Sequence, residues 1–164
     1  MLARLEAARG DPGFTLVELL VVMIILSVLA AIAVPTFLSQ RRNAWNTTTR
    51  SDLASFALAV ESAATDHGGD YAKVLTSAAA PTQLVNSGGL MGVGLVNGFD
   101  FQGSGQVDIV LATPASSSDF CIFGANTHFG AAGAQTDGWI TYSKSHGGLQ
   151  PLVVQTEAAA IALC

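Results

Sequence analysis

The most apolar part of the chain is a long stretch near its N-terminus. Residues 14–38 read FTLVELLVVMIILSVLAAIAVPTFL, and Glu18 is the only ionisable side chain among them. Between Glu18 and Arg41 lie 22 uncharged residues. As an α-helix these would span about 33 Å, and the hydrocarbon core of a bilayer is about 30 Å thick. The stretch therefore predicts a transmembrane helix.

Helical spacing continues beyond the apolar stretch, now with polar residues between the apolar ones. This spacing favours a helix with one buried face. The His-Gly-Gly sequence at 67–69 then supplies a stop signal, since glycine readily adopts the left-handed conformation that ends helices. We predict one helix from Phe14 to Asp66, with residues 14–40 in the membrane and 41–66 in a head domain. The expected buried face comprises Trp45, Leu53, Phe56, Ala57, Val60 and Ala64.

After this helix the sequence changes to turn residues and short runs with the composition of β-strands. Residues 67–105 are rich in glycine, serine and small side chains, which favours an irregular surface loop. Beyond them, residues 106–164 contain β-prone runs separated by turns, which predict three or four antiparallel strands. A sheet with one apolar face against the helix gives an α+β fold. The predicted strands lie near residues 107–112, 120–123, 139–142 and 152–154.

Composition and charge exclude some functions. Of the 164 residues, 50% are hydrophobic and 12% charged, so the apolar excess is that of a membrane-associated chain. The formal net charge is −5, and nine acids follow Ser51 against two lysines. Binding of nucleic acid relies on cations that neutralise phosphates. We therefore expect no direct binding of nucleic acid.

Candidates for catalysis, cofactors or metals are weak. The glycines at 92–98 are spaced G-x-G-x-x-x-G, which differs from a dinucleotide-binding loop, and no helical pattern follows them. His67, His128 and His146 have no metal-ligand spacing, and no Ser/His/Asp or Cys/His set can be assembled. The sequence predicts no catalytic residue, no metal and no cofactor.

The chain has two cysteines, Cys121 and Cys164. One disulfide is the simplest interpretation if this part of the chain lies outside the cytoplasm. Two unpaired thiols are the alternative for a reducing compartment. A disulfide would attach the terminal residue to the sheet, whereas the preceding tail, residues 157–163, would otherwise fray.

A secretory signal peptide is a competing interpretation of the apolar stretch. Residues 31–33 read Ala-Ile-Ala, which matches the small-residue pattern before a signal-peptidase cut, and residues 19–29 have the length of an h-region. A cut after Ala33 would release a secreted binding module. Two features disfavour this interpretation: the segment before residue 19 has no net positive charge, and apolar residues continue to Leu38.

The sequence Gly-Phe-Thr-Leu-Val-Glu at 13–18 resembles the prepilin N-terminus of type IV pilins and of type II secretion pseudopilins. The resemblance implies that a prepilin peptidase cuts after Gly13, removing residues 1–13 as a leader, and methylates Phe14. It implies that Glu18 meets the N-terminal amine of a neighbouring subunit. It also implies that Pro35 marks a place where the helix can melt during assembly; the residues alone equally allow a proline that is tolerated near the end of a membrane helix.

The same resemblance implies a fold and a function. The fold would be type IV pilin-like, with a long N-terminal helix on a small antiparallel sheet. The function would be structural: a precursor in the cytoplasmic membrane polymerises with copies of itself, through the assembly machinery, into a surface pilus. The alternative within the same family is a pseudopilin of a type II secretion or DNA-uptake system, and the motif does not separate the two.

Three arginines, Arg41, Arg42 and Arg50, follow the apolar stretch. The positive-inside rule would place them in the cytoplasm. The prepilin resemblance instead places the leader in the cytoplasm and the rest of the chain outside. We follow the motif for the predicted orientation, which leaves the role of these arginines to be explained.

Overall fold

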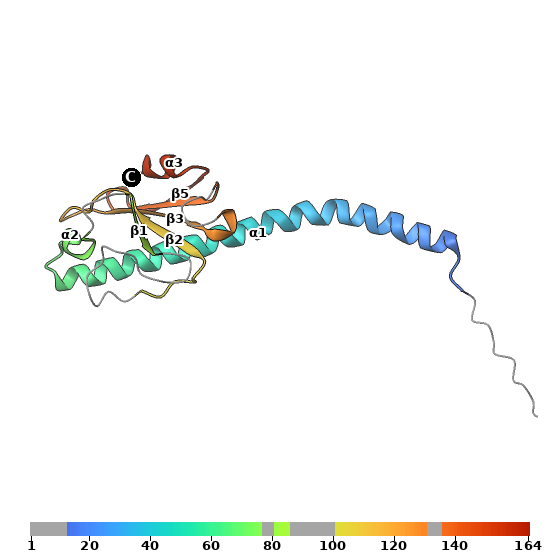
Figure 1. The fold of residues 1–164 in the computed structure, drawn as a ribbon, viewed down its shortest axis with the longest axis horizontal. Helices are drawn as coiled ribbons and strands as arrows, with labels where there is room; N and C mark the ends of the chain where they lie inside the picture. The colour runs from blue at the N-terminus through green and yellow to red at the C-terminus, as the bar shows by residue number, and fades with distance from the viewer. Residues whose placement is uncertain (1–12, 77–80, 86–100, 131–135) are drawn as a thin grey trace, which may run out of the picture. The chain divides into compact units, whose positions relative to one another are not determined.

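The computed structural model describes residues 13–76, 81–85, 101–130 and 136–164. These residues form four helices and five strands (Figure 1). The helices are α1 (Leu16–Asp66), α2 (Tyr71–Val74), the 3₁₀-helix η1 (Thr127–Phe129) and α3 (Glu157–Ile161). The strands are β1 (Thr82–Val85), β2 (Val107–Leu111), β3 (Cys121–Asn126), β4 (Trp139–Ser143) and β5 (Gly148–Val154).

The chain divides into two compact units, Met1–Gln40 and Arg41–Cys164, and α1 contributes to both. In the first unit every described side chain is exposed, and all buried residues belong to the second. At the end of α1, the Gly69 N–H donates to the Ala64 carbonyl at 2.7 Å, with Gly69 at φ +82°. The predicted stop signal is therefore confirmed.

The strands form one antiparallel sheet in the order β1-β2-β3-β4-β5. Each strand pairs with the next one along the chain. This up-and-down order needs only short connections between the paired strands. With the long helix α1, the sheet gives the predicted α+β, pilin-like fold.

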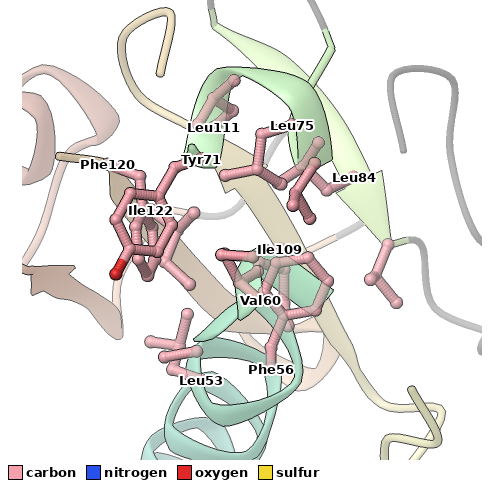
Figure 2. Close-up of a cluster of buried hydrophobic side chains, with 14 of the residues drawn as sticks. Leu53, Phe56, Val60, Tyr71, Leu75, Leu84, Ile109, Leu111, Phe120 and Ile122 are labelled. Carbon is pink, nitrogen blue, oxygen red and sulfur yellow. The ribbon is translucent and has the colours of Figure 1, made fainter. Parts of the chain in front are cut away.

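One face of the sheet packs against the second half of α1 (Figure 2). Leu53, Phe56 and Val60 of α1 are fully buried in this contact. Gly124 of β3 allows the close approach, because a Cβ there would lie 2.7 Å from the Asp108 carbonyl oxygen and 3.4 Å from Leu53 Cδ2. Full burial of such side chains contributes about 1.5–3 kcal/mol each, so this cluster holds α1 on the sheet. The sheet contributes Leu84, Ile109, Leu111, Ile122 and Ile140.

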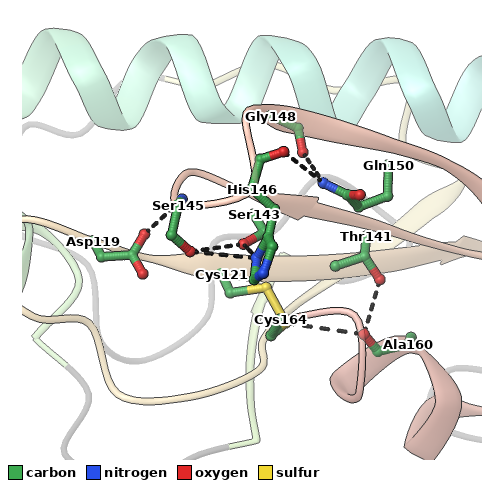
Figure 3. The surroundings of a disulfide bond; sticks show 10 residues. All are labelled: Asp119, Cys121, Thr141, Ser143, Ser145, His146, Gly148, Gln150, Ala160 and Cys164. Atoms are coloured by element: carbon green, nitrogen blue, oxygen red, sulfur yellow. Dashed lines mark hydrogen bonds between the residues drawn. A yellow bond between two sulfur atoms is a disulfide. The ribbon is translucent and has the colours of Figure 1, made fainter.

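The opposite face of the sheet is covered by α3 and the C-terminal residues. Side chains alternate along a strand, so β3 and β4 also supply this second cluster, which buries Phe123 and Trp139 with Ala160 of α3. A disulfide joins Cys121 of β3 to the terminal Cys164 (Figure 3). The sequence left open whether these two cysteines form a disulfide or remain free thiols, and the structure pairs them.

Two segments contain more regular structure than the sequence predicted. Residues 67–105 were predicted as a loop, yet they contain α2 and β1, and β1 adds a fifth strand to the three or four expected. The tail at residues 157–163, which was expected to fray without the disulfide, contains α3, whose Ala159 N–H donates to Thr156 Oγ1 at 3.2 Å. The glycine-spaced segment 92–98 lies outside the described residues.

Two polar side chains of α1 reach other parts of the head. Asp52 was expected between apolar positions of the helix, but it is buried, because its Oδ2 accepts from the Ser104 N–H at 3.0 Å and from Ser104 Oγ at 2.6 Å. Arg50 donates to the carbonyl oxygens of Gln150 at 3.2 Å and Pro151 at 2.8 Å, both in β5. These bonds attach α1 to the β1–β2 connection and to one edge of the sheet.

A third polar contact joins α1, α2 and the β4–β5 turn. Tyr71 OH donates to Glu61 Oε2 at 2.6 Å, and Lys144 Nζ donates to Glu61 Oε1 at 3.1 Å. Lys144 Nζ also donates to Tyr71 OH and lies 4.0 Å from the centroid of that ring. The hydrogen bond to Tyr71 raises the pKa of Lys144, and the Glu61 carboxylate raises it further. Burial raises the pKa of the neighbouring Tyr142.

These pKa shifts predict that the head loses stability at alkaline pH. Lys144 and Tyr142 hold their protons more tightly in the folded chain than in the unfolded chain. As pH rises above about 10, the unfolded chain therefore releases these protons first, and unfolding becomes more favourable. We expect the melting temperature, followed by near-UV circular dichroism in detergent, to fall as pH rises above about 10. Lys144→Gln should reduce the slope, whereas Lys73→Gln, at an exposed lysine, should keep it. Equal slopes for both variants would contradict this prediction.

Candidate functional site

The described chain begins with a short non-helical segment before α1. Gly13 is exposed, and no atom lies within 4 Å of the position that a Cβ would take. The side chain of Phe14 is 91% exposed. Because α1 begins at Leu16, the peptide bond between Gly13 and Phe14 lies outside the helix, with its backbone open to solvent. The predicted helix start at Phe14 was therefore two residues too early.

Thr15 and Glu18 hold the start of α1 through reciprocal hydrogen bonds. Thr15 Oγ1 accepts from the Glu18 N–H at 3.2 Å, and Glu18 Oε2 accepts from the Thr15 N–H at 2.8 Å and from Thr15 Oγ1 at 2.8 Å. This is a capping box, which satisfies N–H groups that have no partner within the helix. Glu18 thus has a local role that the sequence analysis did not assign.

Thr15 is the functional residue that sequence reasoning missed. The signal was present as Thr15-x-x-Glu18 directly before an apolar run, which is the pattern of a capping box. The described contacts of Glu18 all involve Oε2 or its backbone N–H. A surface hollow of about 260 Å³ lies beside this carboxylate, lined by Gly13, Phe14, Thr15 and Glu18. A positive group entering the hollow would meet the carboxylate.

The apolar residues that follow are not buried by any described part of the chain. From Leu16 to Leu38 the large hydrophobic side chains are 46% to 79% exposed. Among the described residues, α1 is the one helix long and apolar enough to cross a membrane. Such an apolar surface is too extensive for a soluble monomer and indicates burial in lipid or against other chains.

Pro35 lies within α1, which continues through it without interruption. Its ring nitrogen carries no hydrogen, so the Ala31 carbonyl loses its usual helical donor. One residue later, Thr36 Oγ1 donates to the Ile32 carbonyl at 3.0 Å. The helix is therefore one hydrogen bond short at this point, which is consistent with a place of easier opening.

Other combinations of reactive side chains do not form a site. Ser143 Oγ lies 2.9 Å from His146 Nδ1, but Ser143 is fully buried. The nearby carboxylate of Asp119 accepts from the Ser145 N–H and does not bind His146, so no Ser/His/Asp set forms (Figure 3). His67, His128 and His146 are all exposed. Within residues 13–76, 81–85, 101–130 and 136–164, no three His, Cys, Asp or Glu side chains could hold a metal ion together.

Comparison with known proteins identifies the N-terminal region. Residues 9–34 match the family model described as the prokaryotic N-terminal methylation motif. The chain is also 40% identical over 53 residues to type II secretion system core protein G of Pseudomonas aeruginosa. That match covers 32% of this chain and 37% of the relative. No solved structure matches the chain. The chain therefore carries a prepilin-type N-terminal methylation motif, whose matched residues include Gly13, Phe14, Glu18 and most of the apolar stretch.

Proposed function

We propose that this chain is a prepilin that becomes a structural subunit of a type IV pilus. A prepilin peptidase cuts after Gly13 and methylates the new N-terminal Phe14. Residues 14–40 anchor the precursor in the cytoplasmic membrane, with residues 41–164 on the outer side. The assembly machinery then transfers the subunit into a filament, in which the apolar helices of many copies form the core.

The observation that carries this proposal is the arrangement at the start of α1. An open, non-helical bond lies between Gly13 and Phe14, and the helix start fixed by Thr15 and Glu18 follows at once. A peptidase needs an accessible, non-helical backbone at the bond that it cuts, and this bond provides one. After cleavage the amine of Phe14 would lie one residue before the N–H that already binds Glu18.

The exposed half of α1 supports assembly through this helix. A plain membrane anchor has no need for Glu18, because an acidic side chain within a bilayer is costly. In a bundle of identical chains, the same carboxylate can meet the amine of a neighbour. We infer that Glu18 sets the axial position of one subunit relative to the next, and that Pro35 lets the helix open as the subunits pack.

A specific observation favours the alternative, a pseudopilin. The matched relative is named as a core protein of the type II secretion system, and the match involves the N-terminal region. The same processing and helix packing would then build a short fibre within the cell envelope. Recovery of the chain as the main component of sheared surface filaments, by electron microscopy and mass spectrometry, supports the pilus. Retention in the envelope supports the pseudopilin.

Intact mass of the mature protein tests the processing step. We expect loss of residues 1–13 and a gain of one methyl group, which leaves 151 residues. Gly13→Leu should block this cleavage, because its side chain obstructs close approach of the peptidase. Ala33→Leu is the matched control and should leave processing unchanged. Loss of residues 1–33 in the wild type, blocked by Ala33→Leu, would instead identify a secreted module and refute the proposal.

A further inference from the structure

The structure gives each of the three arginines after the apolar stretch a different environment. Arg50 is occupied by carbonyl oxygens of β5. Arg42 pairs with Asp137 at 3.4 Å, and the two side chains are 64% and 32% exposed. Arg41 has no carboxylate partner among the described residues, and its guanidinium lies 4.8 Å from the centroid of the Trp45 ring. Of the two arginines nearest the apolar stretch, Arg41 therefore has no carboxylate to neutralise it among the described residues, and Arg42 has an exposed one.

Trp45 is the centre of a cluster that joins α1 to η1. Its ring stacks on His128 with centroids 4.6 Å apart, and Phe129 meets it edge-on at 5.4 Å. Arg41 and His128 are exposed, while Trp45 and Phe129 are half-buried. We call Arg41, Arg42, Trp45, His128 and Phe129 the Trp45 surface. It combines aromatic rings with free positive charge, which is the composition of protein surfaces at the membrane interface.

The position of this surface along the chain matches the depth of lipid headgroups. Arg41 directly follows the last of the 22 uncharged residues. Trp45 lies four residues further, about 6 Å along a helix, and the headgroup region on each side of a bilayer is about 5–7 Å thick. If the uncharged span crosses the hydrocarbon core, both side chains lie at the level of the headgroups.

We propose that the Trp45 surface docks on anionic phospholipid headgroups while the precursor waits in the membrane. This inference rests on the proposed membrane insertion of residues 14–40. Arg41 and Arg42 would bind lipid phosphates, and the Trp45 ring would lie among the headgroups. The ion pair of Arg42 with Asp137 is exposed and contributes little, so Arg42 can exchange this partner for a phosphate.

Charge complementarity supports lipid as the partner of this surface. Beyond Ser51 the head carries nine acids against two lysines, so most of it is repelled by an anionic membrane. The Trp45 surface is the exception, and its first residue, Arg41, directly follows the uncharged stretch in the sequence. The proposal also gives the arginines a role on the outer side, where the positive-inside rule does not expect them.

Tryptophan quenching in vesicles tests this inference with the full-length chain. Trp139→Phe leaves Trp45 as the reporter, and Trp45→Phe leaves the buried Trp139 as the reference. Both are reconstituted in phosphatidylcholine and phosphatidylglycerol containing a lipid with a nitroxide on its headgroup. We expect Trp45 to be quenched several times more strongly than Trp139. The ratio of docked to undocked chains should fall about fivefold for each arginine changed to glutamine, because that is the contribution of one cation to binding at an anionic membrane surface.

Controls separate failure of the inference from failure of the proposed function. Lys73→Gln, which removes a head cation away from the Trp45 surface, should leave quenching of Trp45 unchanged. Equal quenching of the two tryptophans, or no response to Arg41→Gln with Arg42→Gln, would overturn the inference. If Trp45 becomes less accessible to the nitroxide as the protein-to-lipid ratio rises, the partner is a second copy of the chain, and the inference is also overturned. Extraction of the chain from vesicles by alkaline carbonate would instead refute membrane insertion.

Discussion

A chain carrying Glu18→Ala is expected to insert into the membrane like the wild type and to lose filament assembly. The alanine removes the carboxylate that would pair with the amine of a neighbouring subunit inside an apolar bundle. An unpaired buried charge costs about 3–5 kcal/mol, which corresponds to a loss of roughly two to four orders of magnitude in assembly. Filament yield from sheared cells, measured against the amount of membrane-bound precursor, provides the test.

Glu18 also belongs to the capping box, so two further variants separate its roles. Glu18→Gln can keep the hydrogen bonds to Thr15 but removes the charge. Thr15→Ala keeps the charge and removes the capping hydroxyl, which costs only about 1 kcal/mol. If charge pairing drives assembly, Glu18→Gln should resemble Glu18→Ala, and Thr15→Ala should retain most filaments. The opposite ranking would show that Glu18 acts mainly by fixing the start of the helix.

The second large effect is expected from removal of the disulfide by Cys164→Ser. The Cys121–Cys164 bond closes a long loop, with a sequence separation of 43, and the chain-entropy model assigns about 4 kcal/mol to such a closure. The bond also holds α3 over Trp139, which is only 2% exposed. We expect a lower melting temperature and a red shift of Trp139 emission in the Trp45→Phe background.

Two comparisons make the disulfide prediction specific. Reduction of the wild type with dithiothreitol should reproduce the change caused by Cys164→Ser. Ala162→Ser, at an exposed position two residues earlier, should alter neither the melting temperature nor the emission. A wild type whose melting temperature is the same with and without reductant would show that the bond does not stabilise the head.

The sequence allowed the long helix and most of the sheet to be predicted. The α1 residues Leu53, Phe56 and Val60 were recognised because their spacing matches a buried helical face. Strands β2, β3 and β4 were found through runs of β-prone residues between turns. These features depend on periodic patterns within one segment, and such patterns are readable without knowledge of the partner segment.

The missed features depend on partners far away in the sequence. Strand β1 reads TQLV, which is too short to show an alternating hydrophobic pattern. It forms a strand because it pairs with β2. Asp52 is buried because Ser104 supplies two donors from a distant connection. At the N-terminal site, Gly13, Phe14 and Glu18 were identified from the motif. The contact of Trp45 with His128 joins segments that no local pattern relates.

The hydrogen bonds of Arg50 to β5 also bear on how copies of the chain avoid aggregation. As an outermost strand, β5 has backbone groups with which a strand of another chain can pair. Arg50 occupies two successive carbonyls of β5, Pro151 lacks an N–H, and the register with β4 shifts at this point. The β5 edge is therefore a poor template for amyloid-like stacking, even when many heads are crowded together.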